Sequence, residues 1–131
     1  MPFPVDIKFI TETEQELGVE FPESFKIKMM LKNGGELSTE DDDWWLYPFF
    51  DKSDNKRISR TCNHIILETK HAREWHNFPK DGITIASNGT GDQLVLIPSE
   101  SNPNKLKNEI YLWIHETGEI LQVANSISEL A

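Results

Sequence analysis

At 131 residues the chain is long enough to bury one hydrophobic core, and 37% of its residues are hydrophobic. Its 13 Lys and Arg against 22 Asp and Glu give a formal net charge of -9, which repels phosphate backbones and anionic lipid surfaces. Nucleic acids and membranes are therefore poor candidate partners, and a cationic protein is a better one.

The cysteine content and the amino-terminal residues point to the cytoplasm. Cys62 is the one cysteine, so it cannot form a disulfide within the chain, which favours a reducing compartment. The first residues, Met1 to Asp6, have neither the basic nor the apolar segment of a secretory signal. No apolar run approaches the roughly 20 residues that span a bilayer. We therefore expect one domain over residues 1–131, located in the cytoplasm.

The first predicted element is a helix over residues 7–17. Asp6 is of the type that caps a first turn, and Gly18 suits the left-handed residue that follows a last turn. A second helix is predicted from Pro22, which fits a first helical position, to about Lys32. Its apolar residues form two pairs on roughly opposite sides: Phe25 with Met29, and Ile27 with Leu31. A helix that is apolar on two sides is expected to be covered on two sides.

The middle of the chain combines an acidic segment with aromatic residues. Residues 36–43 predict a polar loop, and residues 44–50 form a continuous apolar run that is typical of a strand. Pro48 cannot donate a hydrogen bond within a sheet, so this strand is expected at a sheet edge or broken at the proline. Residues 51–57 predict a turn, and a third helix is predicted over residues 63–75.

The third helix has one apolar and one polar side. The apolar stripe, which is expected to be buried, consists of Cys62, Ile65, Thr69 and Ala72. His76 extends this stripe and is expected to pack or to cap the helix. The polar side carries His64, Glu68, His71 and Trp75. Its two histidines lie about 10 Å apart by helical rise, too far for one zinc ion with ligands at about 2 Å. We expect a solvated face and no metal or other cofactor.

Short strands and turns make up the rest of the chain. Two hairpins are predicted, one with strands 83–86 and 94–97 around the turn 88–91, and one from Glu109 to residue 123 around the turn 116–119. In the second hairpin Ile110, Leu112 and Ile114 point one way, and Tyr111 and Trp113 the other. Residues 126–129 have the pattern of a capping box. Helices followed by an antiparallel meander predict an α+β fold, with the amino-terminal helices and a central helix packed on the sheet.

A catalytic constellation is not apparent in the sequence. Cys62 belongs to the predicted buried stripe, where a thiol packs as a small hydrophobic group. The turn from Asn88 to Asp92 lacks the lysine of a phosphate-binding loop and precedes a strand. Asp92 and His115 can be paired as acid and base, but no nucleophile joins them by motif. We expect a protein that is not an enzyme; the less favoured alternative is a small hydrolase built on Asp92 and His115 or on the polar face of the third helix.

The favoured site lies where the acidic segment meets the aromatic run. Seven consecutive apolar residues cannot all face one core in a regular strand, so some of Trp44, Tyr47 and Phe49 are expected to be exposed or covered by a loop. Aromatic anchors beside a charged rim are typical of protein interfaces, although four carboxylates in a row also suit a plain solvated loop. The predicted partner-binding residues are Glu40, Asp41, Asp42, Asp43, Trp44 and Tyr47.

Five segments occur in an order that resembles one superfamily. They are Leu17 to Phe25 with Asn33-Gly34-Gly35, Phe78-Pro79, Ile83 to Asp92, Ile110 to His115, and Val123 to Ile127. In this order they resemble the SUKH superfamily, which contains the fungal cell-wall synthesis regulators and many bacterial immunity proteins. The resemblance covers nearly the whole chain. The departures are Asn88-Gly89 for Asp-Gly, Trp113-Ile114-His115 for Trp-Asp-His, and a terminal helix cut to one turn.

The resemblance implies an α+β scaffold that acts as a non-catalytic binding module, without binding residues fixed across members. It further implies an immunity protein that neutralises a cognate polymorphic toxin, often a nuclease. A toxin nuclease is usually basic because it binds phosphates, so an acidic inhibitor can compete for that surface. The alternative is a regulatory adaptor that binds a non-toxin protein.

Overall fold

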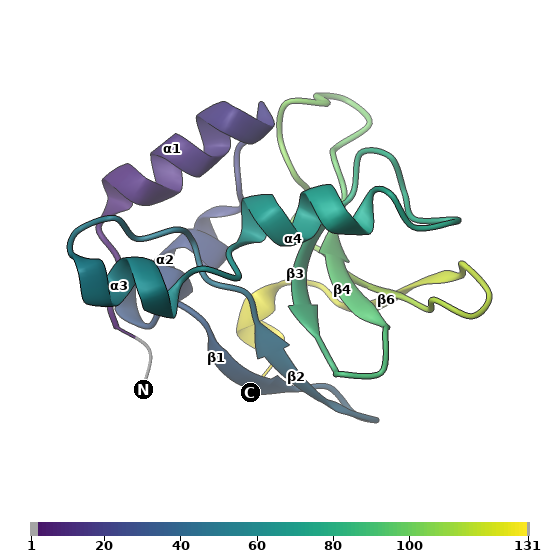
Figure 1. Cartoon of the computed structure of the whole chain (residues 1–131). Coiled ribbons are helices and arrows are strands. Elements are labelled where there is room, and N and C mark those ends of the chain that lie inside the picture. The colour runs from purple at the N-terminus through teal and green to yellow at the C-terminus, as the bar shows by residue number, and fades with distance from the viewer. Residues whose placement is uncertain (1–2, 131) are drawn as a thin grey trace.

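The computed structural model describes residues 3–130, in which a six-stranded antiparallel sheet packs with four α-helices (Figure 1). The helices are α1 (Ile7–Leu17), α2 (Glu23–Leu31), α3 (Asn55–Arg60) and α4 (Ile65–Ala72), and a short 3-10 helix η1 (Ile127–Glu129) follows the sheet. The strands are β1 (Gly35–Ser38), β2 (Asp43–Leu46), β3 (Ile83–Ser87), β4 (Gln93–Leu96), β5 (Ile110–Trp113) and β6 (Ile120–Ala124). Each strand pairs with the next along the chain, so the predicted antiparallel meander and α+β fold are confirmed. None of the described helices is long and apolar enough to cross a membrane.

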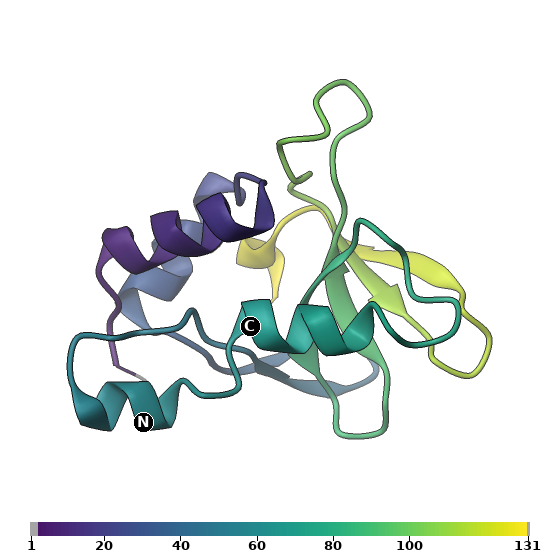
Figure 2. The same cartoon turned by 45° about the horizontal axis from the view of Figure 1, so that its top comes forward.

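The main core lies between the helices and the sheet. α1 contacts both α2 and α4, α4 packs against β3, and α2 packs against η1. Figure 2 shows α1 and α2 above the sheet, with α4 crossing it. At the centre Phe21, Phe25 and Phe49 are each at most 1% exposed, with ring centroids 5.1 to 5.8 Å apart. The predicted alternation in β5 is confirmed, since Ile110 joins this core and Trp113 joins a second, smaller cluster.

The bounds and caps of α1 agree with the prediction. The Asp6 carboxylate accepts a hydrogen bond from the Lys8 N–H at 2.9 Å. Gly18 has a φ of 73° and donates its N–H to the Glu14 carbonyl at 2.8 Å. The left-handed backbone at this position favours glycine, which explains why the helix ends there.

α2 is covered on one side only. Phe25 and Met29 are buried, whereas Ile27 is 53% and Leu31 is 75% exposed. The expectation of a helix covered on two sides is therefore wrong for the described residues. α2 contacts α1 and η1, and these neighbours leave the side with Ile27 and Leu31 open to solvent.

α3 occupies part of the segment for which a turn was predicted, residues 51–57. Asp54 caps this helix by accepting a hydrogen bond from the Arg57 N–H at 2.8 Å. Thr61 ends it, with its hydroxyl donating to the Arg57 carbonyl at 2.8 Å. Cys62 follows outside any helix and is exposed, so the prediction that it is buried is wrong.

α4 is shorter than the helix predicted over residues 63–75. His64 precedes its first turn as a cap, with Nδ1 3.3 Å from the Leu67 nitrogen, and therefore does not lie on the helix face. The rest of the predicted apolar stripe is confirmed as buried: Ile65, Thr69 and Ala72. The chain leaves the α-helix after Ala72, so the stripe does not continue to His76, which is exposed.

The acidic segment over residues 36–43 is not a loop throughout. β1 pairs with β2 so that Leu37 lies opposite Trp44, and both are buried. β2 lies between β1 and β3, so the expected edge position is wrong. β2 does end at Leu46, before Pro48, as a break at the proline predicts. One buried leucine among polar residues is too short a pattern to identify β1 from the sequence.

The capping box at the end of the chain forms only in part. Ser126 makes no side-chain cap to η1, because its Oγ lies 2.6 Å from Ser128 Oγ instead. Glu129 does reach back, and its carboxylate accepts a hydrogen bond from the Asn125 N–H at 2.6 Å. The single turn predicted here is confirmed as η1.

Candidate functional site

Three hairpin turns meet at one end of the sheet. In an antiparallel meander each strand reverses direction, so alternate connections lie at the same end. The turns that join β1 to β2, β3 to β4 and β5 to β6 are therefore neighbours. Asn88 Nδ2 donates to Asp42 Oδ2 at 2.7 Å, which ties the first turn to the second. His115, after β5, bonds to Asp92 at the end of the second turn.

The turn between β1 and β2 is held by its own backbone and by a buried indole. The Thr39 N–H donates to the Asp42 carbonyl at 2.9 Å. Beneath the turn, Trp44 Nε1 donates to Thr39 Oγ1 at 3.0 Å. Glu40 and Asp41 lie at the tip, both exposed, and their side chains make no hydrogen bond or ion pair with a described residue. Two carboxylates on a held turn are therefore free for a partner.

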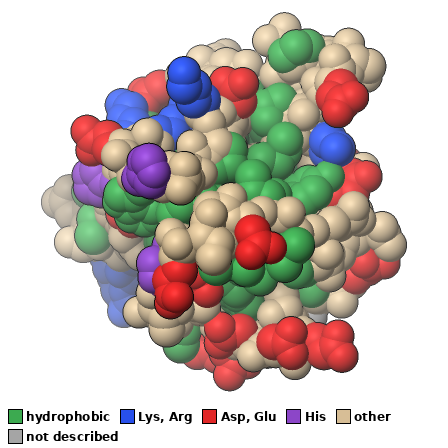
Figure 3. Space-filling model, turned by 90° about the vertical axis from the view of Figure 1, so that its right-hand side faces the viewer, with side chains coloured by type: hydrophobic (Ala, Val, Ile, Leu, Met, Phe, Trp, Pro, Cys, Tyr) green, Lys and Arg blue, Asp and Glu red, His purple; other side chains and the backbone are tan. Residues whose placement is uncertain are grey.

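The three hairpins enclose a hollow of about 380 Å³, which we call the acidic hollow. Its lining residues are Thr39, Glu40, Asp41, Asp42, Trp44, Asp92, Leu112, Gln122 and Val123. Four carboxylates thus adjoin an apolar wall. Figure 3 shows acidic side chains gathered along the lower edge of the face on the β6 side, below hydrophobic side chains at its centre. Such a hollow suits a lysine or arginine side chain, whose charged head and apolar stem use both surfaces.

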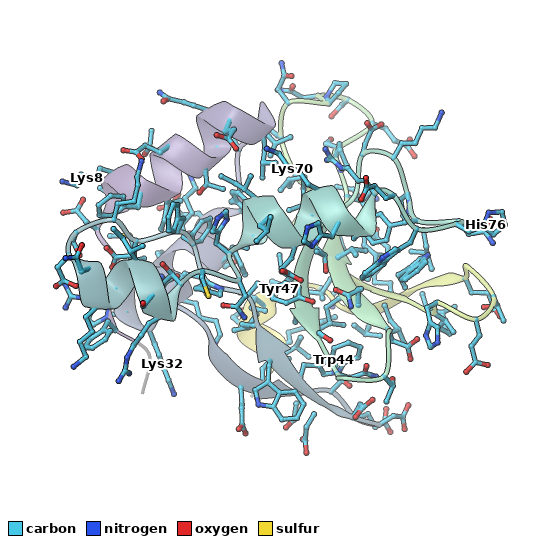
Figure 4. All side chains as sticks on the ribbon, viewed as in Figure 1. Lys8, Lys32, Trp44, Tyr47, Lys70 and His76 are labelled. Atoms are coloured by element: carbon cyan, nitrogen blue, oxygen red, sulfur yellow. The ribbon has the colours of Figure 1, made fainter. Side chains whose placement is uncertain are left out.

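The predicted partner-binding residues fall into two groups. Four of them line the acidic hollow: Glu40, Asp41, Asp42 and Trp44. Asp43 lies outside the lining, and its carboxylate accepts a hydrogen bond from Ser38 Oγ at 2.8 Å. Tyr47 also lies outside it, below α4 in Figure 4. The Tyr47 hydroxyl bonds to Gln93 Oε1 at 3.0 Å, and burial raises the pKa of this hydroxyl.

The exposure of the aromatic run corrects one expectation. Trp44 and Phe49 are buried, at 2% and 0% exposed, and Trp45 is the exposed member at 51%. The alternation of a strand explains this, because residues 44 and 46 of β2 face the core and residue 45 faces the other way. Trp44 lies under the β1–β2 turn, which agrees with the expectation of a covering loop.

Five lining residues are absent from the predicted set. Thr39 directly precedes the predicted acidic residues, and the other four are Asp92, Leu112, Gln122 and Val123. The signal that could have found them is the order of the strands. A meander of predicted hairpins places the turn at residues 88–92 and the β5–β6 hairpin beside the acidic turn. The sequence relates Asp92 to a tight turn and to His115, and Asp92 does bond to His115 in the structure.

Asp92 and His115 form a pair at the rim of the acidic hollow. Asp92 Oδ1 lies 2.7 Å from His115 Nδ1 and accepts the His115 backbone N–H at 3.1 Å. Gly91 leaves room for the ring, since a Cβ there would lie 3.0 Å from the imidazole. Burial raises the pKa of the Asp92 carboxyl, but hydrogen bonds from the His115 ring and backbone outweigh it, so this pKa lies below its ordinary value. The hollow therefore keeps this negative charge as the pH falls.

Asp92→Asn is expected to reduce stability in a pH-dependent way. The pKa of Asp92 is lower in the folded chain than in the unfolded one, so its stabilisation is present above the unfolded pKa of about 3.9 and is lost as the pH falls through the folded pKa. The difference in unfolding free energy between wild type and Asp92→Asn should therefore be fully present at pH 5 and shrink as the pH falls below the unfolded pKa of about 3.9. Urea unfolding at several pH values measures it, with Asp81→Asn as the control. A difference that stays constant with pH would contradict this role.

The other histidines do not gather into a site. His64 stacks on Phe50, with ring centroids 4.4 Å apart, and burial lowers the pKa of its imidazole. His71 and His76 are exposed, so the expectation that His76 packs or caps is wrong; Figure 4 shows it at the outer tip of its segment. Within residues 3–130 no group of three or more His, Cys, Asp or Glu side chains is arranged to hold a metal ion.

Comparison with protein families gives one match that spans the described fold. Residues 4–131 match the family model described as SMI1 / KNR4 family (SUKH-1). The curated proteins and the solved structures give no match. The matched region includes the acidic hollow and all elements from α1 to η1.

Proposed function

Because the chain belongs to the SMI1/KNR4 family (SUKH-1), whose domains are generally non-catalytic immunity or regulatory proteins, we propose that it is an immunity protein. It binds a cognate polymorphic toxin in the cytoplasm and blocks it by covering a basic surface. The observation that carries the proposal is the acidic hollow, where the side chains of Glu40 and Asp41 make no hydrogen bond or ion pair within residues 3–130 and adjoin an apolar wall.

The acidic hollow is pre-organised for a basic side chain. Asp42 is hydrogen-bonded to Asn88, and Asp92 is hydrogen-bonded to His115. Both carboxylates are therefore already positioned, which lowers the entropy cost of binding a partner. Glu40 and Asp41 are left to form charge-assisted hydrogen bonds, which are stronger than neutral ones. An arginine or lysine anchor from the toxin fills the hollow and fixes the orientation of the complex.

The charge of the whole chain supports the same kind of partner. A net charge of -9 creates a negative field that attracts a basic protein from a distance and raises the rate of encounter. Toxin nucleases bind phosphates and are therefore usually basic at the surface that does the chemistry. An acidic inhibitor competes directly for that surface, so binding and inhibition follow from one contact.

Co-expression tests the proposal. The toxin domain encoded beside the gene of this chain should arrest growth when it is expressed alone. Co-expression of the chain should restore growth, and the two proteins should purify together. A neighbouring toxin domain that arrests growth whether or not the chain is present would contradict the proposal. So would substrate turnover by the purified chain that His115→Ala abolishes, because it would favour the hydrolase alternative.

A further inference from the structure

A second cavity lies at the other side of the molecule, and its charge is opposite. It has a volume of about 440 Å³, within the range of small-molecule sites. Its lining residues are Phe3, Asn33, Gly34, Gly35, Trp45, Leu46, Pro48, Asp51, Arg57, Arg60, Thr61 and Asn63. We call it the α3 cavity. It is separate from the acidic hollow, because the two share no lining residue. Figure 1 shows α3 on the left and β6 on the right.

The cationic wall of the α3 cavity is built on an aromatic ring. The Arg57 guanidinium carbon lies 4.7 Å from the centroid of the Phe3 ring, and the Arg60 carbon lies 5.2 Å from it. The cation–π contact holds the Arg57 guanidinium in place without neutralising its charge. Arg57 Nη1 also donates weakly to Ser53 Oγ at 3.3 Å. No carboxylate of residues 3–130 lies within ion-pair distance of Arg57, although the chain has an excess of nine acidic groups.

The lining of the α3 cavity also includes an indole. Trp45 lines the cavity and is 51% exposed, so about half of this residue is accessible to a ligand. Gly34 and Gly35 also line the cavity and contribute backbone without side chains, both at positive φ. Asp51 is the carboxylate in the wall, but it is 2% exposed and its Oδ1 accepts the Ser53 N–H at 3.0 Å. The lining thus offers a ligand the guanidinium of Arg57 and the indole of Trp45.

We propose that the α3 cavity binds a small planar anion, meaning a ring system that carries a carboxylate or a phosphate. The ring stacks on Trp45 and the anionic group pairs with Arg57, whose planar fork matches either group with two hydrogen bonds. The proposal is independent of the toxin, because its residues do not line the acidic hollow. It gives the chain a ligand site in addition to its protein-binding surface.

Calorimetric titration of the purified chain tests the proposal with four probes. Adenosine 5′-monophosphate and indole-3-acetate carry a ring with a phosphate or with a carboxylate, and the arm that binds more tightly identifies the anionic group. Adenosine has a ring but no anionic group, and inorganic phosphate has the anionic group but no ring. At least one ring-bearing anion should bind with submillimolar affinity, and adenosine and phosphate should bind at least tenfold more weakly. Absence of binding by both ring-bearing anions would overturn the proposal.

Matched variants locate the binding. Arg57→Gln and Trp45→Ala should each lower the affinity for the tighter-binding probe at least tenfold, because each removes one of the two groups that recognise it. Lys80→Gln removes a charge, and Trp75→Ala an indole that is 41% exposed, from outside the α3 cavity. Both control variants should bind as the wild type does, and thermal unfolding checks that all four are folded. Equal affinities of Arg57→Gln, Trp45→Ala and the wild type would place the probe elsewhere and overturn the proposal.

Discussion

Trp44→Ala is expected to lower the free energy of unfolding by about 3–5 kcal/mol. The indole is 2% exposed, belongs to the main core and lies opposite Leu37 across the β1–β2 pair. Its removal leaves a cavity that the surrounding sheet cannot fill. It also removes the donor to Thr39 that holds the acidic turn, so the hollow loses both its wall and its geometry. Urea unfolding followed by circular dichroism measures the loss.

The neighbouring tryptophan is the control for this prediction. Trp45→Ala removes a side chain that is 51% exposed and should change the free energy of unfolding by less than about 1 kcal/mol. Trp44→Phe keeps part of the buried aromatic side chain but loses the Nε1 donor. Its loss in the free energy of unfolding should lie between those of Trp45→Ala and Trp44→Ala. A larger loss from Trp45→Ala than from Trp44→Ala would mean that β2 presents its other face to the core, since a one-residue shift exchanges the two faces.

Local chemistry explains which parts of the fold could be predicted from the sequence. The bounds of α1 follow from a capping aspartate and a terminal glycine, and the β3–β4 hairpin follows from two alternating runs around a Gly-rich turn. These signals are contained in a few adjacent residues. The order of the motifs predicts the SUKH superfamily, and the match over residues 4–131 confirms this prediction.

The missed elements depend on contacts between distant segments. β1 has one buried residue, Leu37, and it becomes a strand because it pairs with β2. The periodic stripe through Cys62 suggested one helix, but Thr61 and His64 use their side chains to end α3 and to cap α4. Side-chain hydrogen bonds of this kind compete with helix continuation and are not visible in apolar periodicity.

The candidate site was predicted only in part, because it too depends on contacts between distant segments. The acidic turn is a local feature, and three of its four carboxylates line the hollow. Asp43 has the same charge but differs in contacts, because its carboxylate bonds to Ser38 across the hairpin. Asp92 comes from a turn some fifty residues further along the chain, and only the strand order brings it there. Composition therefore indicated the charge of the surface, and topology determines its shape.

Removing two charges from the tip of the acidic turn is expected to slow toxin binding. The variant Glu40→Gln/Asp41→Asn changes the net charge from -9 to -7 (-9 + 2 = -7). It alters side chains that make no bond to a described residue, so the fold should be retained. Because steering by charge acts mainly on the association rate, we expect this rate to fall about tenfold at low ionic strength and its salt dependence to flatten. Stopped-flow or surface plasmon resonance measurements at several salt concentrations with the cognate toxin domain would show both effects.

The control for this variant removes the same charge from a different surface. Asp81→Asn/Glu100→Gln also leaves a net charge of -7, but these two exposed carboxylates line a different cavity beside Pro79 and Pro98. At about 0.1–0.15 M salt the Debye length is about 8–10 Å, and charges farther from the contact surface are largely screened. If the acidic hollow is the contact surface, the control should therefore slow association much less than Glu40→Gln/Asp41→Asn does at this salt concentration. Equal slowing by both variants would mean that the toxin responds to net charge alone. Unchanged rates in Glu40→Gln/Asp41→Asn would exclude the acidic hollow as the contact surface, whatever the toxin proves to be.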